Sequence, residues 1–376
     1  MRSFRPRLPR EMGRRVRLFP AFLMPQSVET AQGTLAGEIA GGLDWLQRNR
    51  LVGVVGLLRE RGAIESNLAQ IAESPALKIG KVKAWQLDSE REVAAAIGAR
   101  ALRVLILKGA LFAWTVYPQP DQRLRSDMDI LVDPARLDDA RQVLAELGYR
   151  PLYSVAGGTP TEEEAWCRRC KDGVHMVDLH WRLRSHPLLR DRLTFTEQWD
   201  ESVALPALAE GARGQGPVHA VLMASMHWFD ALYASPCPLV WILDLDLVWR
   251  SMTDAQKQSL RELAIERGLS GLVAENLAQA RQEFGTDVAD DYLQSLRAGA
   301  HGRRPTRLIG LRQTRVRAHL YALWCEPGLG PRLRRIRSIL FPPAEYMRQR
   351  YGAGPDARLP SLYWRRISER LSGKKQ

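Results

Sequence analysis

The stretch RLRSDMDILVD, Arg123 to Asp133, decides the fold of this chain of 376 residues. Asp127 and Asp129 stand one residue apart and lead into the apolar run ILV, which predicts a strand entering a core. Side chains two residues apart in a strand project to the same face. Two carboxylates on one face repel each other, so we expect a cation between them. Magnesium suits this position because it takes carboxylate oxygens and keeps open positions for phosphates. The alternative is a surface turn with solvated acids.

A strand and a glycine turn precede the acidic stretch. The β-rich run RVLILKGA, residues 103–110, contains Gly109, which is expected to open the helix LFAWTVY. A glycine at a strand-to-helix turn lets backbone amides approach a phosphate at the helix N-terminus. Lys108 adds a positive charge for that phosphate. Downstream, PARLDDARQVLAELGY predicts a helix that starts at Pro134 and ends at Gly148. The predicted order is therefore strand, glycine turn, helix, acidic strand, helix.

The string LKGALFAWTVYPQPDQRLRSDMDILVDPARLDDARQVLAELGYRP resembles the core of the bacterial uncharacterised nucleotidyltransferase family, a branch of the DNA polymerase β nucleotidyltransferase superfamily. That family shows a K-G turn, a Y-P, an R-x-x-x-D-x-D-x-L-V strand and a helix ending in G-Y. The matching residues are Lys108, Gly109, Tyr117, Pro118, Arg123, Asp127, Asp129, Gly148 and Tyr149. Ala110 departs from the superfamily, which often has a serine after the glycine, so a hydroxyl that assists the triphosphate is missing.

The resemblance implies an α+β fold, in which a small mixed nucleotidyltransferase sheet is flanked by helices and followed and preceded by helical regions. It also implies that Asp127 and Asp129 bind two Mg²⁺ or Mn²⁺ ions, and that Lys108, Gly109 and Arg123 serve the nucleoside triphosphate. The enzyme would move a nucleoside monophosphate to an unidentified acceptor and release pyrophosphate. Two alternatives stay open: a catalytically degenerate nucleotide-binding or interaction module, and a basic binder of membrane or nucleic-acid surfaces.

A later strand supplies the remaining expected site residues. HMVDLHWRL, residues 175–183, alternates like a strand and carries Asp178 and His180. Two-metal nucleotidyl transfer requires a third carboxylate, because the attacking hydroxyl must be deprotonated and its metal held. Asp178 fits this role by its order in the chain, and its alternative role is an ion pair with an arginine such as Arg182. His180 matches an L-H-W element of the family and is expected to orient a metal-bound group or the base; the alternative is a structural histidine.

Four further residues resemble a zinc site only superficially. Cys167 and Cys170 form a C-x-x-C pair, and His175 and His180 follow it. The gap between the two pairs is far shorter than in usual zinc sites. We therefore expect two cysteines in a loop over residues 152–171.

Helical patterns dominate the rest of the chain. Ser89 with Glu92 predicts a capping box, and residues 198–250 are expected to be helical, followed by a helix capped by Thr253. Within this region a buried bond between His227 and Asp244 is the simplest explanation for two polar groups in a core.

Five parts are expected along the chain: a basic arm (1–30), a helical subdomain (31–101), the nucleotidyltransferase core sheet (102–197), a second helical subdomain (198–300) and a basic helical C-terminal region (301–376).

The composition adds expectations about location and partners. No apolar run approaches the roughly 20 residues of a membrane span, and four cysteines in so long a chain favour a reducing cytoplasm. The net charge is +13, and residues 301–376 contain 18 lysines and arginines against 4 acidic residues. Such a region favours acidic partners, so the C-terminal region is expected to contact an anionic membrane surface, which would make the protein peripheral, or a nucleic acid.

Overall fold

A seven-stranded mixed sheet forms the centre of the molecule, with the strand order β3-β4-β5-β2-β1-β7-β6. The structure is a computed structural model that describes residues 50–54, 82–152, 162–183, 186–231, 238–300, 320, 322–342, 344–354 and 356–371. The strands are β1 (Val104–Ile106), β2 (Met128–Val132), β3 (Arg150–Leu152), β4 (Glu163–Cys170), β5 (Gly173–His180), β6 (Val203–Ala204) and β7 (Arg213–Gly214).

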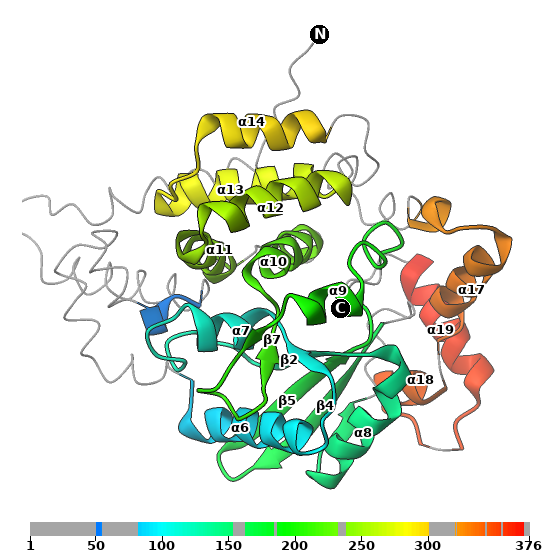
Figure 1. Ribbon diagram of the computed structural model, residues 1–376. Coiled ribbons are helices and arrows are strands. Elements are labelled where there is room, and N and C mark those ends of the chain that lie inside the picture. The colour runs from blue at the N-terminus through cyan, green and yellow to red at the C-terminus, as the bar shows by residue number, and fades with distance from the viewer. Residues whose placement is uncertain are drawn as a thin grey trace, which may run out of the picture.

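Helices surround this sheet (Figure 1). Around the sheet lie η1 (Val52–Val54), α6 (Ala84–Ala99), α7 (Lys108–Thr115), η3 (Pro134–Arg136), α8 (Leu137–Glu146) and α9 (Phe195–Asp200). A stack follows, with α10 (Pro217–Ala231), α11 (Val240–Ser251), α12 (Asp254–Glu266), α13 (Ser270–Phe284) and α14 (Asp290–Gly299). The C-terminal helices are α17 (Leu329–Leu340), α18 (Ala344–Arg350) and α19 (Leu359–Leu371). In Figure 1, α6 and α8 lie below the sheet, the stack lies above it, and α17 to α19 lie to its right.

The acidic stretch forms the central strand β2, as its sequence predicted. All five residues of β2 are buried, because β1 pairs with it on one side and β5 on the other. A strand covered on both faces has a continuous apolar run, which is the pattern that follows Asp129. The α+β fold class with helical flanking and C-terminal regions is thus confirmed.

Three local expectations were wrong. The expected loop over residues 152–171 contains β4, so Cys167 and Cys170 lie on a strand; its polar sequence lacks an apolar alternation, and pairing with β3 and β5 forms the strand. The expected helical stretch after residue 198 contains β6 and β7, and β7 pairs with β1. Ser89 does not cap a helix, because α6 begins upstream and the Ser89 hydroxyl donates to the Trp85 carbonyl oxygen at 2.8 Å.

Other helix ends follow the sequence. Pro134 starts a helical turn capped by Asp133, and the segment ends at Gly148, whose φ of +81° favours glycine. Thr253 forms a capping box with Gln256 at the start of α12.

The basic arm over residues 1–30 lies outside the described residues. Within the part of the chain that is described, no helix combines the length and apolar character needed to cross a bilayer.

Two buried arginines hold the loop that leads into β2. Arg123 donates to both carboxylate oxygens of Asp244 on α11, at 2.7 and 2.6 Å. Arg125 does the same to Glu90 on α6, at 2.7 and 2.6 Å. Glu90 also accepts from the Trp114 indole at 2.9 Å. The loop is thereby tied to helices on both sides of the sheet by bidentate pairs, whose geometry is fixed by the planar guanidinium group.

We expect Glu90→Ala to lower the free energy of unfolding by about 3 to 5 kcal/mol, because removing one member of a buried pair leaves the Arg125 charge buried and unpaired. The Glu90 and Arg125 side chains are 0% and 2% exposed. Urea unfolding measures the change. The matched control is Asp139→Ala, which removes an ion pair to Arg136 whose two side chains are about half exposed and should cost less than about 1 kcal/mol. If the two substitutions lowered the free energy of unfolding equally, the buried Glu90–Arg125 pair would not have the stabilising role given to it here.

Candidate active site

The pairing of β2 with β5 brings two predicted acids together. The two strands run parallel, and Asp129 lies directly opposite Asp178 in their register. Neighbouring strands are about 4.8 Å apart, and opposite residues project to the same face. Asp127 stands just before β2, two residues from Asp129, and lines the same cavity as the other two carboxylates. Asp127 and Asp129 at β2 and Asp178 on β5 therefore line one cavity.

Lys108 provides the nearest positive charge. Its Nζ donates to Asp129 Oδ1 at 2.5 Å. Lys108 has a φ of +48° at the turn between β1 and α7, a left-handed conformation that costs a non-glycine residue about 1 to 2 kcal/mol. This strained backbone directs the Lys108 ammonium group toward Asp129. The rest of the fold offsets the cost of the strain and so holds a positive charge beside the carboxylates.

The pKa values of the three aspartates shift in opposite directions. Burial raises the pKa of Asp178 to about 7, and the charges of Asp129 and Asp127 add to this effect. Burial and the charge of Asp129 also raise the pKa of Asp127. For Asp129, burial acts in the same direction, but the Lys108 charge and the His180 hydrogen bond outweigh it and lower its pKa. The carboxylate of Asp129 is thus stabilised in its charged form by Lys108 and His180. The charged forms of Asp127 and Asp178 are not stabilised in the same way.

Eighteen residues line the cavity around these acids. Acidic, basic and aromatic groups all contribute to it. Its lining comprises Arg50, Lys108, Gly109, Phe112, Arg123, Arg125, Ser126, Asp127, Asp129, Glu162, Glu163, Asp178, Arg182, Leu183, Ala224, His227, Trp241 and Asp244. Lys108, Gly109, Arg123 and the three aspartates that the sequence indicated therefore share one cavity.

His180 is the predicted site residue that does not line this cavity. It is fully buried and contacts Asp129 Oδ1 through Nε2 at 2.9 Å. Its Nδ1 lies 3.0 Å from Glu163 Oε2. His180 therefore connects Asp129 to a second carboxylate and fixes the orientation of both, as outer groups do around metal ligands.

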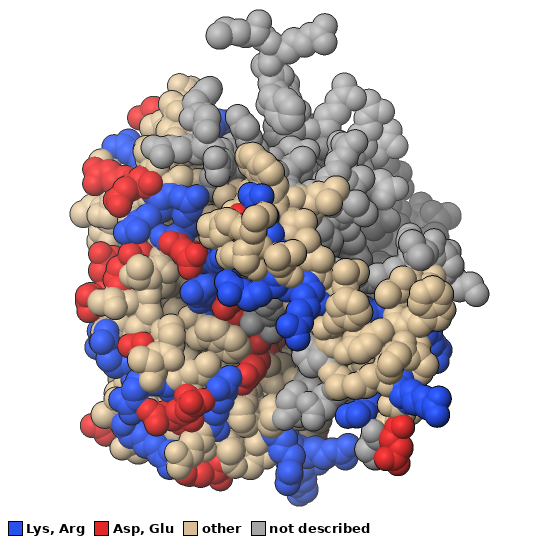
Figure 2. All heavy atoms as spheres, turned by 90° about the vertical axis from the view of Figure 1, so that its right-hand side faces the viewer, with Lys and Arg blue, Asp and Glu red and all other residues tan. Residues whose placement is uncertain are grey.

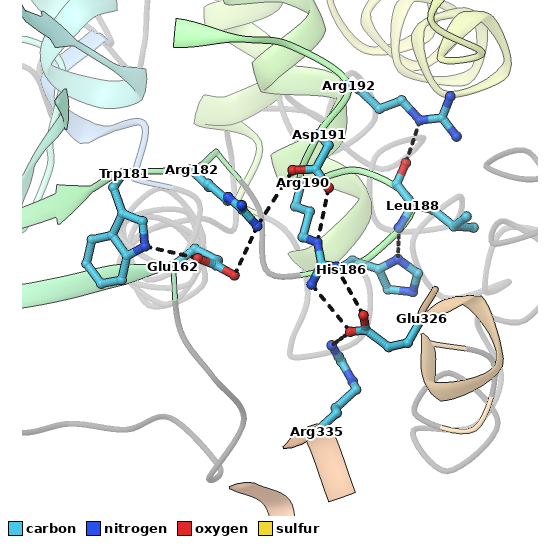
Figure 3. A network of polar contacts seen from close by, with 10 residues as sticks. All are labelled: Glu162, Trp181, Arg182, His186, Leu188, Arg190, Asp191, Arg192, Glu326 and Arg335. Carbon is cyan, nitrogen blue, oxygen red and sulfur yellow. Dashed lines mark hydrogen bonds and ion pairs between the residues drawn. The ribbon is translucent and has the colours of Figure 1, made fainter. Parts of the chain in front are cut away.

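Arg123 and Asp244 also have defined partners. The bidentate bonds of Arg123 to Asp244, together with a hydrogen bond from the Tyr117 hydroxyl to Asp244 at 2.7 Å, hold both side chains at the cavity wall. Asp244 is buried and hydrogen-bonded, as expected of a polar group in a core, but the partners found are Arg123 and Tyr117. The expected bond between His227 and Asp244 stays a prediction. Arg182, the alternative partner considered for Asp178, lies 3.7 Å from Glu162 and 3.6 Å from Asp191 (Figure 3).

Several lining residues were not predicted as site residues. Glu163 was assigned to a loop, yet as part of β4 it reaches His180. Arg50 brings positive charge from a segment without a motif, and Arg182 was considered only as a partner of Asp178. His227, expected only to bond to Asp244, forms a ring contact with Trp241 at 4.3 Å between centroids.

The donor set of the cavity suits a divalent hard cation. Mg²⁺ and Mn²⁺ prefer carboxylate oxygens. Burial, followed by the charge of neighbouring aspartates, raises the pKa values of Asp127 and Asp178, and a bound cation would favour the charged form of both. Among the described residues, no three His, Cys, Asp or Glu side chains are arranged to hold one ion as they stand. The chemistry of the residues fits the metal, and the side chains would have to turn toward it.

The mixed sheet, the Lys-Gly turn and the paired strand carboxylates define the class of nucleotidyltransferases with a DNA polymerase β-like fold. A family model described as uncharacterised nucleotidyltransferase matches residues 43–285, and the chain belongs to this family. The match includes every predicted site residue and ends before the C-terminal helices. No curated protein matches the chain.

The solved structures that are similar to the chain include the following two. One is the solution structure of the antibiotic-resistance factor ANT(2'')-Ia, with 16% identity and a TM-score of 0.36 over 50% of this chain and 94% of that one. The other is an antigenic nucleotidyltransferase-like protein from Paracoccidioides brasiliensis, with 14% identity and a TM-score of 0.35 over 58% of this chain and 95% of that one.

The raised pKa of Asp178 predicts a pH-dependent stability. Between the ordinary value of 3.8 and about 7, folded Asp178 keeps a proton that the unfolded chain has lost, so this residue destabilises the fold as pH rises through that window. Asp178→Asn removes the effect. In chelator, we expect the variant to gain about 1 to 2 kcal/mol of unfolding free energy over the wild type between pH of about 4 and about 8.

Urea unfolding across this pH range measures the difference. Asp138→Asn is the exposed control, since the Asp138 side chain is 93% exposed, and its difference from the wild type should stay level. A level difference for Asp178→Asn as well would show that burial and the neighbouring charges do not raise the pKa of Asp178 in the folded protein.

Proposed function

We propose that this protein is a metal-dependent nucleotidyltransferase that moves a nucleoside monophosphate from a nucleoside triphosphate to an acceptor and releases pyrophosphate. The observation that carries the proposal is that Asp127, Asp129 and Asp178 share one cavity with the Lys108–Gly109 turn. Three acids and a phosphate-binding turn are the groups that this reaction requires. Family membership supports the proposal.

The three aspartates would hold the metal. Asp127 and Asp129 would bind two Mg²⁺ or Mn²⁺ ions, and Asp178 would bind the one beside the acceptor hydroxyl. The ions would supply neutralisation of phosphate charge and a lowered pKa of that hydroxyl. His180 would keep Asp129 oriented through its 2.9 Å hydrogen bond, and would act on the substrate through Asp129.

The turn and the nearby cations would bind the triphosphate. Lys108, which donates to Asp129 at 2.5 Å, would offer its positive charge to the phosphate oxygens, and Asp129 would hold the metal. Gly109 lies at the start of α7 and lines the cavity, so its lack of a side chain would let phosphate approach the backbone amides. Arg123, held by Asp244, would contribute its charge at the wall. Because nucleotides are its substrates and its cysteines are few, we also propose a cytoplasmic location.

Asp129→Asn and Asp178→Asn should each lower the rate of pyrophosphate release by about a thousandfold or more, because losing a metal ligand removes several kcal/mol of charge stabilisation. The assay measures pyrophosphate release with each of the four nucleoside triphosphates and Mg²⁺ across pooled acceptors, namely sugars, small alcohols, peptides and RNA ends.

Asp139→Asn, an exposed aspartate on α8, is the control and should keep full activity. Activity that survives both site substitutions would sink the proposed mechanism. The pool that gives release identifies the class of acceptor.

Gly109→Ala should weaken triphosphate binding by roughly tenfold or more while the protein stays folded. A Cβ at Gly109 would meet Arg123 and Arg125 only at 3.5 Å, an ordinary contact, so any loss must come from the space that the phosphate needs. Calorimetry with a nonhydrolysable triphosphate and Mg²⁺ measures the affinity. Gly330→Ala is the control, because an added Cβ there meets nothing within 4 Å. Unchanged affinity in Gly109→Ala would remove this turn from the phosphate site.

A second candidate is a nucleotide-binding module without turnover. Ala110 favours it, because this residue is buried at the start of α7 and offers no hydroxyl where the superfamily often has one. Triphosphate binding without pyrophosphate release from any acceptor pool would support the module over the enzyme.

A further inference from the structure

We propose that the C-terminal helix α17 is a docking element for an anionic phospholipid surface. The inference is independent of the proposed transfer reaction. It rests on the orientation of α17, whose apolar face is exposed and whose opposite face is buried.

Helix α17 exposes its apolar stripe. Leu329, Leu333, Ile336 and Leu340 follow each other at steps of four, three and four residues, so they lie on one face. Their exposed fractions are 75%, 64%, 36% and 42%. Helices of globular proteins normally bury such a stripe. Within the described residues, the exposed large apolar side chains lie almost all in this region, with Val174 as the one outside it.

The opposite face of α17 is the buried one, and it carries a charge. Arg335 is 6% exposed and donates to Glu326 at 3.0 Å, and Glu326 is itself 3% exposed. Arg190, from the segment after β5, donates to the same carboxylate at 3.0 Å (Figure 3). This buried three-residue pairing fixes the rotation of α17 against the core, so the apolar stripe has to face outward.

The apolar residues of the neighbouring helices α18 and α19 pack with each other and leave the stripe of α17 exposed. Tyr346 and Met347 of α18 pack with Leu362 of α19 into a small separate cluster. Trp324 and Trp364 add exposed fractions of 55% and 73% to the same region. Figure 2 views this side of the molecule and shows basic side chains beside the uncharged surface. Aromatic side chains of this kind are enriched at the membrane–water boundary.

The charge of α17 selects the partner. The helix contains four arginines and no acidic residue, and Arg334 and Arg337 on it are exposed. Two copies of the chain joined through this face would bring like charges together, which disfavours a symmetric dimer. A nucleic acid would match the arginines but not the leucines. An anionic bilayer matches both, since leucines enter the acyl boundary while arginines contact lipid phosphates.

The test is flotation of the full chain with vesicles of phosphatidylcholine alone and of phosphatidylcholine mixed with phosphatidylglycerol, without nucleotide. We expect binding to the mixed vesicles that weakens with salt. The double variant Leu329→Gln, Leu333→Gln should bind at least about tenfold more weakly, and Arg334→Gln with Arg337→Gln should lose the preference for anionic vesicles. All four side chains are exposed, so melting temperatures should match the wild type.

Val174→Gln is the matched control, an exposed apolar residue outside the region, at 48%, and it should bind like the wild type. Asp129→Asn should also bind normally, which separates this proposal from the transferase proposal. Absence of wild-type binding, or equal binding by the leucine variant, would overturn the inference. A wild-type dimer that the leucine substitutions convert to a monomer, with no vesicle binding, would assign the face to a second copy.

Discussion

The register between β2 and β5 is the constraint on which the rest of the site depends. Because these strands run parallel with Asp129 opposite Asp178, two carboxylates are held about one strand spacing apart. Asp127 adds a third, and backbone hydrogen bonds prevent the strands from moving away. The protein responds to this repulsion with the charge of Lys108 and the hydrogen bond of His180, both directed at Asp129. The remaining excess of negative charge is what makes the cavity a candidate metal site.

Buried ion pairs secure the framework around these strands. Arg123 and Arg125 lie two residues apart, and their side chains reach α11 and α6 respectively. The loop before β2 therefore cannot shift without breaking two bidentate pairs in a medium of low dielectric constant. The same arrangement links the helical stack to the sheet, so that Asp244, His227 and Trp241 become part of the cavity wall. Both parts of the fold therefore build the cavity.

In the C-terminal region, a buried glutamate sets the orientation of a helix. The bonds of Glu326 with Arg190 and Arg335 determine which face of α17 looks outward. Arg190 also contacts Asp191, which lies near Arg182 at the cavity (Figure 3). The docking helix and the cavity are thus joined by a short chain of charged contacts. The match to the family ends at residue 285, so this helix lies outside the part that the family model describes.

The sequence by itself determined the acidic strand, the Lys-Gly turn, the order of elements around them and the identity of the three aspartates, because these depend on local spacing and on short apolar runs. Strand β4 was missed, since its pairing with β3 and β5 forms it and its residues show no apolar period. Glu163 therefore entered the site only through the tertiary structure. The partners of Arg123 and His180 and the outward stripe of α17 also depended on it, because contacts across more than a hundred residues, or across neighbouring strands, leave no local pattern. Local propensity thus indicated which residues are candidates for the site, and long-range packing determined what each of them touches.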